Sequence, residues 1–171
     1  MANVFEQCSS DYQSDAEVTR IFYAFVQNKM HFAVTGKTAA EIVHARADDE
    51  RSTMELTTWK ASPDGKVLKS DIKVAKNYLS EKELDKLNRI VTMFIDHAEF
   101  QALNEQIMTM KAWIGITDDF LKYNRQEVLQ NSGKISNKEA IAKVGIEYDK
   151  FRIKQDEDYI SDFDKAMKKF L

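Results

Sequence analysis

The stretch "SEKELDKLNRIVTMFIDHA", residues 80–98, decides the fold class of this chain. Its first four residues match a capping box, in which the side chains of Ser80 and Glu83 each accept a hydrogen bond from the other residue's backbone amide. Apolar residues then recur every three or four positions, the spacing of one face of an α-helix. These positions are Leu84, Leu87, Ile90, Val91, Phe94, Ile95 and Ala98. The pattern predicts a helix of about twenty residues, some 30 Å long.

Two helices are expected before this stretch. Apolar spacing predicts a first helix that Ser14 or Asp15 can cap and that Gly36 ends. A second, short helix follows, because Thr38-Ala39-Ala40-Glu41 is another capping box. It is expected to cover about residues 39–48.

Two further helices are expected after it. Thr109 can cap a helix that continues through Leu121, and Ser136-Asn137-Lys138-Glu139 is a third capping box. The stripe that follows this box is Ile141, Val144, Tyr148, Phe151, Gln155, Tyr159, Phe163, Ala166 and Phe170. It advances by about 3.6 residues per step, the period of an unsupercoiled helix. Such a stripe requires a bundle or a partner chain to pack against.

The predicted fold is therefore mostly α, a bundle of about five to six helices with one irregular or hairpin-containing segment over residues 49–79. The turn signal "ASPDG" within that segment could close a small hairpin or mark a long loop. Residues 1–14 are predicted to be a tail, from which Val4 and Phe5 could dock, and residues 15–171 a single helical domain.

Composition excludes several classes of protein. The 171 residues contain 25 Lys and Arg against 28 Asp and Glu, and the net charge of −3 argues against a globally basic nucleic-acid binder. Cys8 is the single cysteine, which fits a reducing cytoplasm. The longest apolar run near the start, residues 21–26, is too short for a signal sequence or a membrane span. We therefore expect a cytoplasmic protein without membrane contact.

The stretch "VTGKTAAE", residues 34–41, ends in the Gly-Lys-Thr of a phosphate-binding loop. That loop requires a glycine five residues before its second glycine, and position 31 is His31. A strand should also precede it, whereas a helix is predicted. We interpret Gly36 as a helix end, although the free amides beside Lys37 could attract an anion.

The same stretch can be compared with the Fic motif, in which His31 and Gly36 would fall at the right separation. Alanine or threonine replaces the motif's Phe, acid and Arg at positions 33, 35 and 39, and Lys37 replaces its Asn. Loss of the acid and the arginine argues against transferase chemistry.

His44 and Asp48 are four residues apart, so both could face one metal ion on a helix. Two ligands do not make a site, and we favour a solvated helix end with an Arg46–Glu50 surface pair. No metal and no cofactor are expected. Charged residues before an irregular segment nevertheless indicate the place for a binding cleft. The candidate cleft residues are His31, Lys37, Thr38, His44, Arg46, Asp48 and Trp59.

A basic run follows Trp59, which could serve as a stacking platform for single-stranded nucleic acid. The run consists of Lys60, Lys66, Lys69, Lys73 and Lys76, diluted by Asp64 and Asp71. The acidic net charge favours a solvated loop instead. No serine, cysteine or paired carboxylates form a recognisable catalytic pattern.

Several blocks in order carry a family resemblance: "FVQNKMHFAVTGKTAAEIVHARADDE", "LTTWKASPDGKVLKSDIKVAKNYLSEKELDKLNRIVTMFIDHAE", "MTMKAWI" and "SGKISNKEAIAKVGIEYDKFR". Together they resemble the C-terminal part of the RhuM family of bacterial virulence-associated proteins, over nearly all of residues 17–155. Longer members carry a preceding segment that looks like a DNA-binding module, so this chain is expected to be a fragment or a shortened member. The resemblance implies a bacterial cytoplasmic accessory protein linked to mobile or pathogenicity loci, and it implies no reaction.

The leading hypothesis is a non-catalytic helical domain that binds a protein partner or itself, because the C-terminal stripe is apolar and a catalytic pattern is missing. One alternative is a degenerate Fic-like enzyme that uses nucleotides through His31. Another is a nucleic-acid-binding accessory domain, acting through residues 59–76 or through a missing N-terminal portion.

Overall fold

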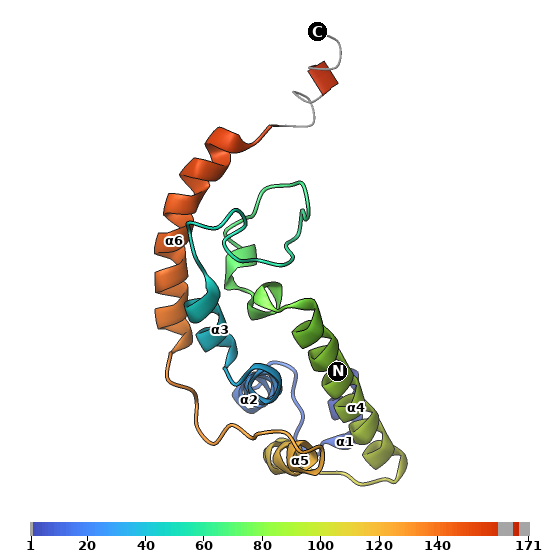
Figure 1. The fold of residues 1–171 in the computed structure, drawn as a ribbon. Helices are drawn as coiled ribbons and strands as arrows, with labels where there is room; N and C mark the ends of the chain where they lie inside the picture. Colours follow the sequence, from blue (N-terminus) through green and yellow to red (C-terminus); the bar gives the residue numbers. More distant parts are fainter. Residues whose placement is uncertain (1, 161–165, 168–171) are drawn as a thin grey trace.

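A computed structural model describes residues 2–160, 166 and 167 of the chain. Within these residues the fold is mostly α, as predicted, and contains six α-helices and two short 3₁₀ helices (Figure 1). The α-helices are α1 (Ala2–Cys8), α2 (Glu17–Thr35), α3 (Ala39–Arg46), α4 (Glu81–Leu103), α5 (Met110–Tyr123) and α6 (Asn137–Asp158). The 3₁₀ helices η1 (Asp71–Lys73) and η2 (Ala75–Tyr78) lie between α3 and α4.

The helix ends follow from local side chains. Both bonds of the predicted capping boxes form at Thr38 and at Ser80. Gly36 adopts a left-handed conformation with φ of 71°, and its amide donates to the Phe32 carbonyl, so it ends α2 as predicted. The predicted cap of α2 was wrong, because its N-cap is Ala16, which makes no side-chain capping bond.

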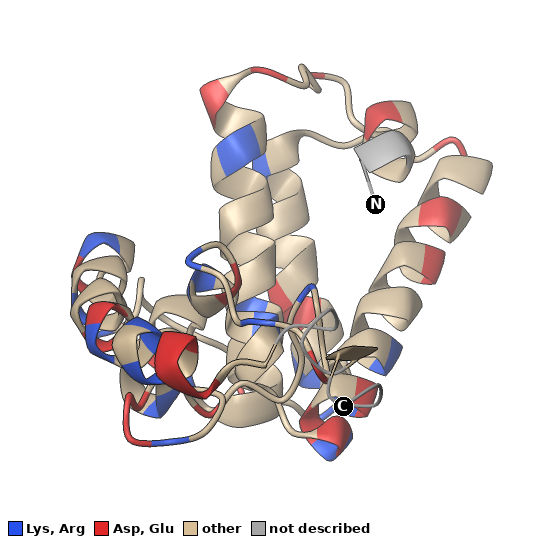
Figure 2. Cartoon of the chain, turned by 90° about the horizontal axis from the view of Figure 1, so that it is seen from above, with Lys and Arg blue, Asp and Glu red and all other residues tan. Residues whose placement is uncertain are grey.

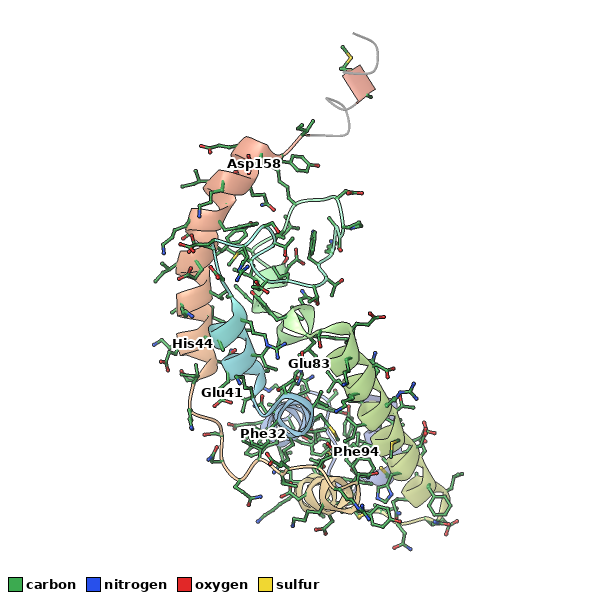
Figure 3. All side chains as sticks on the ribbon, viewed as in Figure 1. Phe32, Glu41, His44, Glu83, Phe94 and Asp158 are labelled. Atoms are coloured by element: carbon green, nitrogen blue, oxygen red, sulfur yellow. The ribbon has the colours of Figure 1, made fainter. Side chains whose placement is uncertain are left out.

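An aromatic core joins α1, α2, α4 and α5. The ring of Phe5 lies 4.9 Å from that of Phe22, 5.1 Å from that of Trp113 and 5.9 Å from that of Phe94, measured between centroids. All four side chains are fully buried, and Figure 3 shows Phe94 directed from α4 into this interior. Residues 2–8, expected to belong to a tail, therefore form a helix that docks into the core through Phe5.

A buried cation fixes α2 to α5. The Nζ atom of Lys29 lies 2.7 Å from Oδ1 of Asp118 and donates to the Leu129 carbonyl at 3.0 Å. The Lys29 side chain is only 7% exposed, against 28% for Asp118. Removing a charge from water is costly unless it is paired, so this contact specifies how the two helices meet.

The remaining helices form a second layer, in which α6 packs along α3 on the side of the molecule opposite α4 (Figure 1). Segment 49–79 is irregular, as predicted, and contains η1 and η2 but no hairpin. The Gln155 side chain binds this segment at Val67. It accepts a hydrogen bond from the Val67 amide at 2.7 Å and donates one to the Val67 carbonyl at 3.2 Å. The Tyr148 hydroxyl also donates to that carbonyl at 3.2 Å.

The helix that carries the first part of the predicted C-terminal stripe ends before the predicted stripe does. Val144, Tyr148 and Phe151 are buried in the layer with α3 and segment 49–79, so these apolar side chains are covered within the chain. The helix ends at Asp158, because Tyr159 is extended, with φ of −75° and ψ of 118°. Phe163 and Phe170 lie outside the described residues. These three residues of the stripe therefore do not require a partner chain.

No helix in the described part of the chain combines the length and apolar character needed to cross a membrane.

Candidate functional site

The seven candidate cleft residues do not converge on one cleft. His31 lines a groove between α2, the η1–η2 segment and α4. Lys37 and His44 line a second hollow, formed against the loop 128–135. Trp59 lines a third hollow, beside the end of α6.

The other three candidates, Thr38, Asp48 and Arg46, make contacts that stabilise the fold. Thr38 is buried within its capping box. Asp48 accepts from the amide of Glu50 at 3.0 Å in the turn after α3, which has already ended at Arg46. His44 and Asp48 therefore do not share a helical face. Among the described residues, no three His, Cys, Asp or Glu side chains are placed to hold a metal ion.

Arg46 forms an ion pair with Glu83, whereas we expected a pair with Glu50. Its two terminal nitrogens lie 2.6 and 2.7 Å from the Glu83 carboxylate oxygens, and one of them also donates to the Tyr78 carbonyl at 2.7 Å. Figure 3 shows Glu83 at the start of α4, facing α3. The hydrogen bonds from Arg46 lower the pKa of Glu83 to about 2. This bidentate pair connects the two layers of the fold.

Replacing Glu83 with glutamine is expected to lower the free energy of unfolding at pH 7 by about 1–2 kcal/mol, a range reduced for partial exposure to solvent. Because folding lowers the pKa of Glu83, its ion pair contributes fully above about pH 4.5. The contribution is lost as the pH falls from 4.5 toward 2. Urea unfolding at pH 7 and at pH 2.5 measures this, with Glu81→Gln in the same helical turn as the control. An equal loss at both pH values would contradict the assignment.

His31 lines the hollow between α2, η1–η2 and α4, which we call the His31 groove. Its Nδ1 atom lies 2.8 Å from the Gln27 carbonyl, to which the neutral ring donates. Its Nε2 atom is buried and has no hydrogen-bond partner among the described residues. Burial lowers the pKa of His31; the hydrogen bond to the Gln27 carbonyl opposes this in part, and the charge of Lys76 adds to the lowering, so the neutral ring is favoured at pH 7. Nε2 is then an unused acceptor.

The fold places the lysines of the basic run in different surroundings. Lys66 lies 2.7 Å from Asp156 and Lys69 lies 3.7 Å from Asp149, so carboxylates of α6 face two of its five lysines. Figure 2 shows acidic and basic segments interleaved along α6, not a continuous basic face. Lys73 and Lys76 lie at the His31 groove. Trp59 is partly buried, and its Nε1 donates to the Gly65 carbonyl at 2.8 Å.

Sequence reasoning missed an apolar surface on α4, α5 and the connection between them. We call it the α4–α5 apolar face; its exposed members are Met93, Phe100, Leu103, Ile107 and Tyr123. Leu103 is 81% exposed and Tyr123 is 89% exposed. Beside them lies a hollow of about 580 Å³ lined by His97, Met108, Ile116 and Phe120, among others. The available signal was that Met93 and Phe100, seven residues apart, lie off the core stripe of α4.

The described residues form a mostly helical fold with an exposed apolar face and separate polar hollows. The sequence matches the model of the Virulence protein RhuM family over residues 1–159, which is nearly the whole chain. The chain belongs to this family. No curated protein and no solved structure matches it.

Proposed function

We propose that this RhuM-family chain is a non-catalytic interaction domain that associates with a second copy of itself through the α4–α5 apolar face. The observation that carries the proposal is the exposure of five large apolar side chains on α4, on α5 and on the connection between them, beside the hollow that Tyr123 lines. Large apolar side chains gathered on an exposed surface mark interaction sites in soluble proteins. We further propose that the protein acts in the bacterial cytoplasm, which the unpaired, buried Cys8 supports.

The shape of this face favours a second copy as the partner. Leu103 is exposed on α4, and the exposed Tyr123 forms part of the wall of the hollow that His97 and Phe120 also line. In a two-fold symmetric dimer the same patch meets itself, so a projection on one copy faces a depression on the other. A surface that offers both can be self-complementary. Burial of these side chains would supply roughly 25 cal/mol per Å² of apolar area removed from water.

Phe100→Asp is expected to weaken self-association at least about tenfold, because the change places a charge in the apolar face of both copies. Light scattering and sedimentation across a dilution series measure the change. Phe100 is 59% exposed, so the folded monomer is expected to remain intact.

Ile146→Asp is the matched control for this experiment. Ile146 is 62% exposed but lies on α6, away from the α4–α5 apolar face, so self-association should not change. A native chain that stays monomeric at high concentration would remove the proposal. Equal effects of the two substitutions would remove the assignment of the face.

A further inference from the structure

The His31 groove differs in charge from the other hollows. Lys73 and Lys76 line it, both are exposed, and neither has an ion-pair partner among the described residues. No aspartate or glutamate lines this groove. Four other hollows each include a carboxylate, such as Asp119 beside the α4–α5 apolar face and Glu41 beside Lys37. The groove therefore favours a negatively charged ligand.

Its apolar walls restrict the body of that ligand. The buried side chains of Val26, Met30 and Leu87 line the groove, together with Val74 and Val91. No Phe, Tyr or Trp lines it, so a nucleobase would find no stacking platform. The volume of about 620 Å³ lies within the range of small-molecule sites. An aliphatic body fits these walls better than a planar aromatic one.

The polar wall of the groove contains one buried atom, Nε2 of His31, that has no hydrogen-bond partner among the described residues. Besides the two lysines it contains Gln27, Asn88 and Thr92, which can orient a polar head group. His31, in the same wall, keeps a buried Nε2 acceptor without a donor. Buried polar atoms are normally satisfied, and this acceptor requires a donor, which a water molecule or a singly protonated phosphate can supply and an ionised carboxylate cannot.

We propose that the His31 groove binds a small aliphatic anion, with its carboxylate or phosphate head at Lys73 and Lys76 and its chain against Met30 and Leu87. The head group makes charge-assisted contacts, and the chain is removed from water. The residues that line this groove differ from those of the α4–α5 apolar face, although both sets include residues of α4, and the proposal does not rest on self-association.

Calorimetric titration of the full chain with octanoate and with octyl phosphate tests the proposal. Saturable binding of either probe is expected, and comparing the two identifies the preferred head group. Octylammonium, which has the same chain and the opposite charge, should not bind. Lys73→Ala/Lys76→Ala should weaken binding at least about tenfold, since two charge-assisted contacts are lost. Both lysines are exposed, and circular dichroism checks that the variant is folded.

Lys82→Ala/Lys111→Ala is the matched control, because it removes the same charge from exposed positions outside the groove. Its affinity for the octyl anions should equal that of the native chain. The proposal is overturned if neither octyl anion binds saturably, if octylammonium binds equally well, or if the two double variants behave alike. Tighter binding of ATP than of octyl phosphate would overturn the aliphatic assignment and favour the nucleotide-using alternative.

Discussion

Replacing Phe5 with alanine is expected to lower the free energy of unfolding by about 3–5 kcal/mol, the range for removing a buried aromatic ring. Phe5 is fully buried and contacts aromatic rings from α2, α4 and α5. The cavity would lie where these helices meet, so their packing cannot easily close it. Urea unfolding followed by tryptophan fluorescence measures the loss, because Trp113 is one of the contacting residues.

Gln7→Ala, on the same helix, is the control for this experiment. Gln7 is exposed, so its substitution should change stability by no more than about 0.5 kcal/mol. A similarly small effect of Phe5→Ala would mean that α1 does not dock in solution.

Lys29→Met is expected to destabilise the fold by about 2–4 kcal/mol, because it leaves Asp118 with a charge and without its partner. The carbonyl of Leu129 also loses its donor. Asp118 is 28% exposed, so water recovers part of the loss. Adding Asp118→Asn should restore some stability, and the difference between the double and single variants gives the coupling energy.

Lys111→Met serves as the control, since Lys111 is exposed on α5 and should contribute little. If the changes in unfolding free energy caused by Lys29→Met and Asp118→Asn simply add in the double variant, the two side chains do not interact.

The helices were predictable where their signals are local. A capping box such as Ser80 to Glu83 acts within one turn, and its geometry does not depend on the rest of the fold. The tail prediction failed for residues 2–8 because α1 has only seven residues, too few for a periodic pattern. Its stability comes from the contacts of Phe5 with distant helices, and these contacts do not appear in a local pattern.

The candidate cleft was harder to predict because neighbours in the sequence face different parts of the molecule. Arg46 finds its partner 37 residues away, in Glu83, while His44 on the same helix faces a separate hollow. The chain also leaves α3 after Arg46, which turns Asp48 away from the helical face assumed for it. The α4–α5 apolar face was not predicted because Phe100 and Leu103 lie off the core stripe of α4 and join residues of α5 only in the folded chain.

The attachment of segment 49–79 to α6 affects the order in which the protein can fold as it is made. Val67 bonds to Gln155, which lies 88 residues later in the chain. At typical rates of synthesis, roughly 4–18 seconds separate the emergence of these two residues from the ribosome. Throughout that interval the backbone of Val67 lacks its later partner. Nascent chains halted before residue 137 should therefore expose this segment to proteases, whereas chains released after residue 160 should protect it.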